Sequence, residues 1–79
     1  MAGWVEEAGA LGKDFRFRDF AEALAFVNRV GEAAEQMNHH PDIDIRWNTV
    51  TLRLSTHSAG NVVTDLDREL ASRIDGLEA

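Results

Sequence analysis

Residues 43–54, with the sequence IDIRWNTVTLRL, decide the fold of this 79-residue chain. Apolar side chains alternate with polar ones over residues 43–47, and they alternate again over residues 50–54. A period of two is typical of strands that are buried on one side only. Asn48 and Thr49 stand between the two runs and predict a tight turn, although the glycine of the strongest hairpin signals is missing. The sequence therefore predicts an antiparallel hairpin.

The register of this hairpin is expected to bring histidines together. If the turn is as predicted, the ladder ends with His40 opposite His57, and a three-residue loop would bring His39 opposite His57 instead. Directly opposed residues in a sheet have Cβ atoms about 5 Å apart. Pro41 donates no ladder hydrogen bond and can end the pairing early. In either register we expect imidazoles to converge at one end of the hairpin.

A helix and two shorter segments are expected before the hairpin. Residues 13–18 alternate phenylalanine with charged residues and predict another half-buried strand. Residues 8–12 are small and predict a turn, and residues 4–7 predict an edge strand. Asp19 is placed to cap a helix, because Glu22 follows three residues later as in a capping box.

That helix carries two apolar stripes, which together cover about half its circumference, wider than the ~100° stripe that one core requires. The first stripe consists of Phe20, Leu24, Val27, Gly31 and Ala34. The second stripe consists of Phe26, Val30, Ala33 and Met37. We expect the first stripe to cover the sheet and the second to contact a partner subunit. The alternative is that both are buried within one subunit. Asn38 suits the end of the helix, and Pro41 prevents its continuation.

A second helix is expected after the hairpin. Residues 58–61 are typical of a loop, and Thr64 can cap a helix with Asp67 three residues on. The apolar stripe of this helix is Leu66, Leu70, Ile74 and Leu77. The resulting order is β-β-α-β-β-α, which predicts an α+β fold: a four-stranded antiparallel sheet with two main helices packed on one face.

Composition limits the classes of function. The net charge is −6, and eight basic residues are scattered among fourteen acidic ones, so we expect no direct binding of nucleic acid. No apolar run approaches the roughly 20 residues of a bilayer span, and no signal peptide is visible, so we expect no membrane association and a cytoplasmic location. A chain this short without cysteine has a marginal core, so we expect it to gain stability by oligomerisation.

The three histidines are the candidate chemical groups. Imidazole titrates near neutrality, so a cluster of rings can hold one as a base and another as an acid. Three histidines can also hold zinc, but the adjacent His39 and His40 would normally project differently, which ranks this interpretation lower. A third interpretation is a polar loop after a helix. The pattern of residues alone leaves these alternatives open.

Four motifs resemble the pterin-4a-carbinolamine dehydratase family. They are EQMNHHP at residues 35–41, WNTV at 47–50, LSTH at 54–57 and DRELA at 67–71. The His-His-Pro sequence alone would be a weak signal, whereas the combined spacing is highly specific. The resemblance extends over nearly the whole chain, from about residue 4 to residue 77.

The resemblance implies a fold, an activity and a site. It implies the sheet and helices described above, one domain over residues 1–79, and assembly as a homodimer or homotetramer. The implied enzyme is a hydro-lyase that converts a 4a-hydroxytetrahydropterin to a quinonoid dihydropterin and water, by histidine acid–base catalysis and without a metal or other cofactor. The matching catalytic positions are His39, His40 and His57. The matching substrate-binding or supporting positions are Glu35, Pro41, Trp47 and Asp67.

The supporting positions also have purely structural interpretations. Glu35 can be a solvated helix residue, Trp47 can belong to the core, and Asp67 can be the third-position carboxylate of the last helix, where it favours the helix dipole. The chain also departs from the family pattern. The family's usual first helix, ahead of the Trp4 region, is missing from this sequence. The loop over residues 58–65 is one residue longer than the common form, and Asn61 replaces a frequent glycine.

Two alternative functions follow from the same resemblance. Some relatives act as dimerisation cofactors of a homeodomain transcription factor, so this chain could be a non-catalytic protein-interaction or dimerisation module of the same fold. It could also be a pterin-related regulatory or assembly protein. The three histidines, all retained here, favour chemistry.

Overall fold

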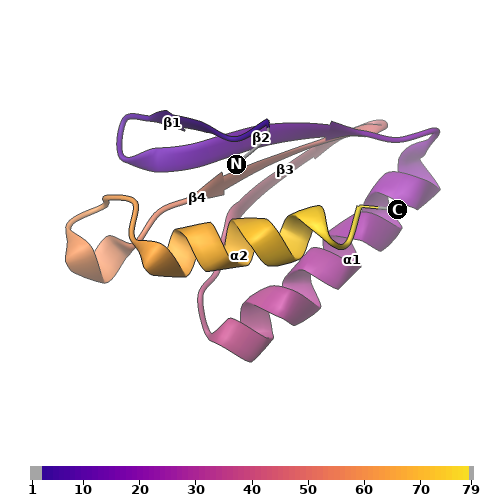
Figure 1. Ribbon diagram of the computed structural model, residues 1–79. Coiled ribbons are helices and arrows are strands. Elements are labelled where there is room, and N and C mark those ends of the chain that lie inside the picture. Colours follow the sequence, from indigo (N-terminus) through magenta and orange to yellow (C-terminus); the bar gives the residue numbers. More distant parts are fainter. Residues whose placement is uncertain (1–2, 79) are drawn as a thin grey trace.

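A four-stranded antiparallel sheet with both helices on one face forms the computed structural model, which describes residues 3–78 (Figure 1). The strands lie in the spatial order β1-β2-β4-β3. Their bounds are β1 Val5–Glu7, β2 Ala10–Arg16, β3 Asp42–Arg46 and β4 Thr49–Leu54. The helices are α1 Phe20–Met37 and α2 Asp65–Asp75, and a short 3-10 helix, η1, spans His57–Ala59. The predicted element order and fold class are confirmed.

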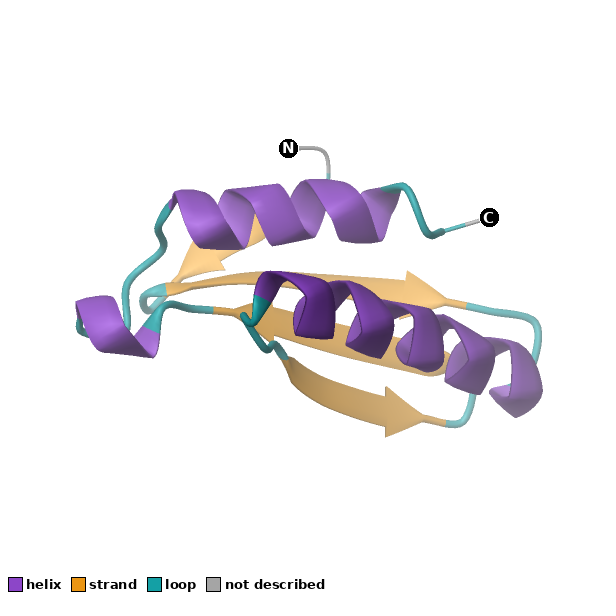
Figure 2. Ribbon diagram, turned by 90° about the horizontal axis from the view of Figure 1, so that it is seen from below, coloured by secondary structure: helices purple, strands orange, loops and turns teal. Residues whose placement is uncertain are grey.

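The two helices cover the same side of the sheet, as the view from below shows (Figure 2). Helix α1 begins where predicted, because the Asp19 carboxylate accepts the backbone N–H of Glu22 at 2.9 Å. It ends at Asn38, whose backbone is left-handed with φ of 49° and whose N–H donates to the last carbonyls of the helix. Within residues 3–78, neither helix is both long and apolar enough to cross a membrane.

The core lies between the sheet and the helices, and the second stripe of α1 contributes more to it than the first, of which Ala34 is buried and Val27 is half-buried. Phe26 is fully buried, and its ring lies 4.8 Å from that of Phe15 and 4.9 Å from that of Phe17, measured between centroids. Phe20 and Leu24, which were expected to cover the sheet, are exposed. Both stripes are apolar, so the pattern could not show which one faces the sheet. The docking of the helix decides it.

The β3–β4 hairpin turns one residue earlier than predicted. Trp47 and Asn48 form the turn, and Arg46 pairs with Thr49. The predicted register was therefore wrong by two residues, a shift that leaves every side chain on its expected face of the sheet. Asn48 fixes the turn in its actual place, because its side-chain amide donates to the Phe17 carbonyl at 2.9 Å and its own carbonyl accepts the Phe17 N–H at 2.8 Å.

The N-terminal hairpin is also longer than the sequence indicated. Strand β2 begins at Ala10, within the residues that were expected to form a turn. The turn lies at Ala8 and Gly9, both with positive φ, and Val5 pairs with Gly12. Glycine is needed at position 9, because a Cβ there would lie 2.2 Å from the carbonyl oxygen of Asn61.

Candidate active site

The three histidines line one pocket of about 440 Å³, at the end of the β3–β4 hairpin opposite to its turn. His39 and His40 belong to the connection between α1 and β3, and the left-handed Asn38 turns the chain into it. The backbone N–H of His39 still donates to the Ala34 carbonyl at 3.1 Å, so this segment is tied to the helix. His57 begins η1 on the other side of the pocket.

The convergence of the histidines thus occurs, but not through the expected ladder. With the actual register, β3 and β4 pair only as far as Asp42 with Arg53, and His40 does not face His57 across the sheet. The two segments meet beyond the ends of the strands, where the chain is no longer paired as a regular ladder. The prediction of a shared pocket did not depend on the register that was used to reach it.

His39 and Asp67 form the buried part of the site. The Nε2 atom of His39 lies 2.5 Å from Oδ1 of Asp67, and this contact joins the α1–β3 connection to the first turn of α2. The side chain of Asp67 is 0% exposed and that of His39 is 11% exposed. A carboxylate can only accept a hydrogen bond, so Nε2 of His39 carries the hydrogen and donates it.

Three donors converge on the Asp67 carboxylate. Burial by itself would raise the pKa of Asp67, but hydrogen bonds from His39, Thr56 and the Thr64 amide, together with the charge of His39, hold this pKa below its ordinary value of 3.8. The Thr56 hydroxyl donates to Oδ2 at 2.7 Å, and the Thr64 N–H donates to the same oxygen at 2.8 Å. Asp67 is therefore a buried carboxylate that remains ionised at neutral pH.

His40 and Glu35 form a second histidine–carboxylate pair at the rim of the pocket. The Nε2 atom of His40 is hydrogen-bonded to Oε2 of Glu35, from the last turn of α1. Both side chains are exposed, at 55% for His40 and 77% for Glu35. His57, the third histidine, is also exposed. The pocket therefore offers one sheltered ring and two rings open to water.

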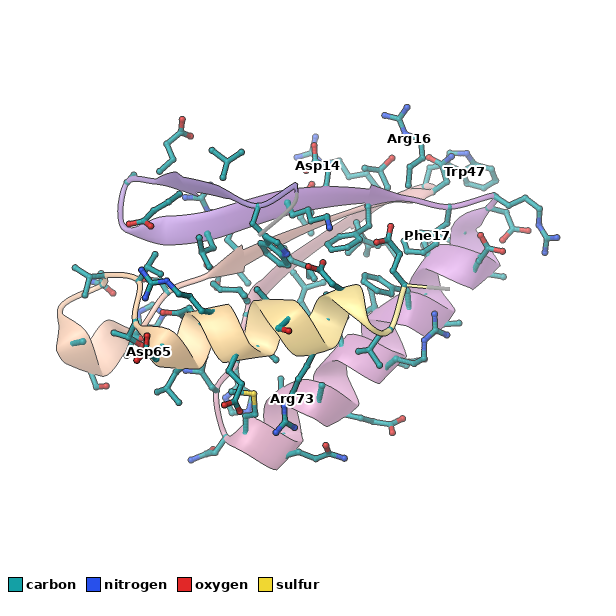
Figure 3. The ribbon with its side chains drawn as sticks, in the orientation of Figure 1. Asp14, Arg16, Phe17, Trp47, Asp65 and Arg73 are labelled. Atoms are coloured by element: carbon teal, nitrogen blue, oxygen red, sulfur yellow. The ribbon has the colours of Figure 1, made fainter. Side chains whose placement is uncertain are left out.

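The remaining predicted residues lie in different places. Pro41 lines the histidine pocket, and it also lines a neighbouring groove of about 670 Å³ between α1 and β3. Trp47 is exposed in the hairpin turn, at the far end of the sheet from Asp65, which begins α2 (Figure 3). Trp47 is not among the residues that line the histidine pocket in this chain, and at 67% exposed it does not belong to the core either.

Several residues in or behind the pocket were not predicted as site residues, among them Thr56, Thr64 and Leu66. Thr56 is buried and contacts Asp67, and Thr64, which was expected only as a helix cap, contacts Thr56. Leu66, which was expected in the core, is exposed and lines the pocket. The position of Thr64 three residues before Asp67 was a usable signal for the cap, but nothing in the pattern pointed to its contact with Thr56.

The donor groups of the site bear on the zinc interpretation. Among residues 3–78, no group of three or more His, Cys, Asp or Glu side chains is arranged to hold a metal ion. His39 and His40 each direct Nε2 to a different carboxylate, on different elements. The geometry is that of two separate histidine–carboxylate pairs.

Comparisons with known proteins place the chain among close relatives. The family model described as "Pterin 4 alpha carbinolamine dehydratase" matches residues 1–77. A relative from Sulfurisphaera tokodaii, provisionally named a pterin-4-alpha-carbinolamine dehydratase, is 49% identical over 77 residues, which are 98% of this chain and 82% of the relative. A relative of the same name from Nocardia farcinica is 50% identical over 77 residues, with 98% and 80% covered.

Two solved structures have the same fold. A transcriptional coactivator/pterin dehydratase from Brucella melitensis superposes with a TM-score of 0.92 at 32% identity, covering 99% of this chain and 84% of that one. A pterin dehydratase-like protein identified as a RuBisCO assembly factor in the alpha-carboxysome superposes with a TM-score of 0.82 at 26% identity, covering 98% and 90%.

Proposed function

Because the chain belongs to the pterin 4 alpha carbinolamine dehydratase family, we propose that it dehydrates a 4a-hydroxytetrahydropterin to a quinonoid dihydropterin and water. The observation that carries this proposal is the pocket in which one sheltered histidine, held by an ionised carboxylate, stands with two water-exposed histidines. Such a pocket supplies sites for both the removal and the delivery of a proton. The proposal covers residues 1–79 as a single domain in the cytoplasm.

The reaction requires two proton transfers and no change of oxidation state. A base takes the proton from N5 of the pterin, and the electron pair of that N–H bond becomes the second bond between N5 and C4a. The C4a–O bond breaks with its electron pair on oxygen, and an acid delivers a proton to that oxygen, so that water leaves. General acid–base groups contribute roughly 10²–10⁴-fold each. The base and the acid then return to their starting states by proton exchange with solvent.

The environments of the histidines assign them different roles in this proposal. His39 is the base, because the ionised Asp67 beside it stabilises the positive charge that its ring gains with the proton. His40 and His57 are exposed to water, from which the proton delivered to the leaving hydroxyl can be replaced, and one of them acts as the acid. Pro41 and Glu35 support His40.

The decisive experiment is a dehydration assay with chemically generated 4a-hydroxytetrahydropterin. We expect the protein to accelerate dehydration above the spontaneous rate in the same buffer, and we expect His39→Ala to lose most of that acceleration. A protein that is folded by circular dichroism but gives only the spontaneous rate would overturn the proposal.

A protein-interaction module is the second candidate function, and two observations favour it. One structural neighbour is a RuBisCO assembly factor, and this chain exposes Phe20, Leu24 and Ile43 on α1 and β3. An interaction role without turnover predicts that the folded protein gives the spontaneous rate in the assay above. The same assay therefore separates the two candidates.

We propose that the exposed side of α1 is a contact between copies of this chain in a homodimer or homotetramer. Phe26, the residue first expected at such a contact, is buried in the core, whereas Phe20 and Leu24 remain exposed. Leu24→Asp should therefore shift sedimentation toward the monomer while the protein stays folded. Arg18→Asp, at an exposed position just before the helix, is the matched control and should leave the assembly unchanged. An unmodified protein that sediments as a monomer at micromolar concentration would contradict this proposal.

A further inference from the structure

Two threonine hydroxyls lie behind Asp67, on the side away from His39. Oγ1 of Thr56 is 2.7 Å from Oδ2 of Asp67 and 2.7 Å from Oγ1 of Thr64. The backbone N–H of Thr64 donates to the same Oδ2 atom at 2.8 Å, as part of the capping box that begins α2. Thr56, Asp67 and His39 thus form a connected series from the end of β4 to the pocket.

The direction of every hydrogen bond in this series follows from the number of hydrogens available. The ionised Asp67 only accepts, so the single hydroxyl hydrogen of Thr56 is used in donating to Oδ2. The contact between the two threonines must then have the Thr64 hydroxyl as its donor. Oδ2 accepts two hydrogen bonds, and Oδ1 is the oxygen left to face His39.

The backbone holds Thr56 firmly in this position. Its N–H donates to the Val62 carbonyl at 2.9 Å, and its carbonyl accepts the N–H groups of Ala59 at 3.2 Å and Asn61 at 3.1 Å. The side chain is buried, and no buried polar side-chain atom among residues 3–78 lacks a hydrogen-bond partner. Thr56 is therefore a fixed donor that cannot turn to another acceptor without leaving Asp67 unsatisfied.

We propose that Thr56 and Thr64 are positioning residues, which hold Asp67 so that only its Oδ1 atom meets Nε2–H of His39, and which thereby leave Nδ1 of His39 as the nitrogen that exchanges a proton in the pocket. A carboxylate that could rotate would present either oxygen, and it would hold the imidazole less firmly in one orientation and one tautomer. The part of this inference that concerns catalysis rests on the proposed dehydratase function. The part that concerns the tautomer of His39 does not.

The experiment compares Thr56→Val, which removes the hydroxyl but keeps the branched shape, with Thr56→Ser, which keeps the hydroxyl. Thr51→Val is the matched control. Thr51 lies on β4, the strand that ends two residues before Thr56, and its hydroxyl donates to Oδ1 of Asp14 at the same 2.7 Å distance, but on the exposed face of the sheet. All three variants are assayed for kcat and KM, and the imidazole nitrogens of His39 are observed by long-range ¹H–¹⁵N NMR in the resting protein.

We expect Thr56→Val to lower kcat by roughly 10–100-fold, the range that is typical when a residue that orients a metal-binding histidine is removed, with little change in KM. We expect Thr56→Ser to restore kcat to within a few-fold of the unmodified protein, and Thr51→Val to leave it unchanged. In the NMR spectra, the unmodified protein should show His39 with its hydrogen on Nε2 at high pH. Thr56→Val should show a mixture of tautomers.

Each outcome bears on one of the two proposals. A folded Thr56→Val variant that keeps the Nε2–H tautomer and full kcat would overturn the positioning role. If Thr56→Val does not fold, Thr56→Ser and the NMR spectrum of the unmodified protein still test the positioning role. A spectrum that shows the hydrogen of the His39 ring on Nδ1 would also overturn that role. If the unmodified protein shows only the spontaneous dehydration rate, the proposed function fails, whereas the tautomer measurement remains a valid test of the hydrogen-bond series.

Discussion

Two adjacent histidines in one pocket make the same kind of contact in opposite surroundings. His39 donates to Asp67, which is buried and lies 28 residues away in the sequence, whereas His40 contacts Glu35, which is exposed and lies five residues away. Water screens the exposed pair, and such pairs contribute roughly 0.2–1 kcal/mol. A buried charge has no such screening, so its partners must satisfy it. We therefore expect the proposed chemistry to depend more on the buried pair than on the exposed pair.

The largest effect is expected from Asp67→Asn, which breaks the buried pair. The asparagine carries no charge, and its amide can turn an N–H toward His39, so we expect kcat to fall by roughly 100-fold. The free energy of unfolding should also fall by about 1–3 kcal/mol, because buried donors lose an ionised acceptor. Steady-state assays and urea unfolding measure the two effects. Asp65→Asn, at an exposed position in the same turn of α2, is the control and should change neither. A folded Asp67→Asn protein with near-normal kcat would show that the buried pair is not essential.

A smaller effect is expected from His57→Ala, which leaves both pairs intact and removes the third histidine. Dehydration should slow by at least roughly tenfold, because one acid–base group is lost. The side chain is exposed, so the thermal midpoint should stay close to that of the unmodified protein. The stopped-flow rate and the circular dichroism melting curve test these two expectations. Unchanged turnover in a folded variant would limit the chemistry to the two pairs.

Glu35→Gln breaks the exposed His40–Glu35 pair, and its effect can be compared with that of breaking the buried His39–Asp67 pair. We expect kcat to change by less than about fivefold, since an exposed ion pair is worth no more than about 1 kcal/mol. Raising the salt concentration should reduce even this difference, because ions screen exposed charges. Glu32→Gln, one turn earlier on the same exposed side of α1, is the matched control. A loss as large as that of Asp67→Asn would mean that exposure does not weaken the His40–Glu35 pair.

The smallest effect concerns stability in acid. The pKa of Asp67 is lower in the folded protein than its ordinary value of 3.8, so folding favours the ionised form. The resulting stabilisation is fully present above about pH 3.8 and is lost as the pH falls through the folded pKa. The difference in unfolding free energy between the unmodified protein and Asp67→Asn should therefore shrink below about pH 3.8. Urea unfolding at pH 6, 4 and 3 measures it. A difference that stays constant or grows in acid would contradict the direction of the shift.

The hairpin shows how far the pattern of residues could lead. Alternation with a period of two predicted both strands, and it predicted the buried face of β4, whereas Ile43 and Trp47 on the expected buried face of the first run are exposed. It could not fix the turn, because a register shift of two residues keeps every side chain on the same face. The contact between Asn48 and Phe17, residues 31 apart, selects the actual turn.

The candidate site could likewise be predicted only in part from the sequence. The grouping of the histidines was reachable from the sequence, because His39 and His40 precede β3 and His57 follows β4, and the two ends of a hairpin must meet. The burial of Asp67 was not reachable, because it depends on how α2 packs over the end of β4. Thr56 gave no signal of its own for the same reason, since its partners Asp67 and Thr64 lie on another element.

By itself, the sequence determined the order of strands and helices, the caps at Asp19, Asn38 and Thr64, and the approach of three histidines to one another. Each of these follows from backbone geometry acting over a few residues. Only the tertiary structure decided which stripe of α1 is buried, where the hairpin turns, and which histidine is sheltered. Those outcomes depend on contacts between elements far apart in the chain, where several arrangements satisfy the same local pattern and packing selects among them.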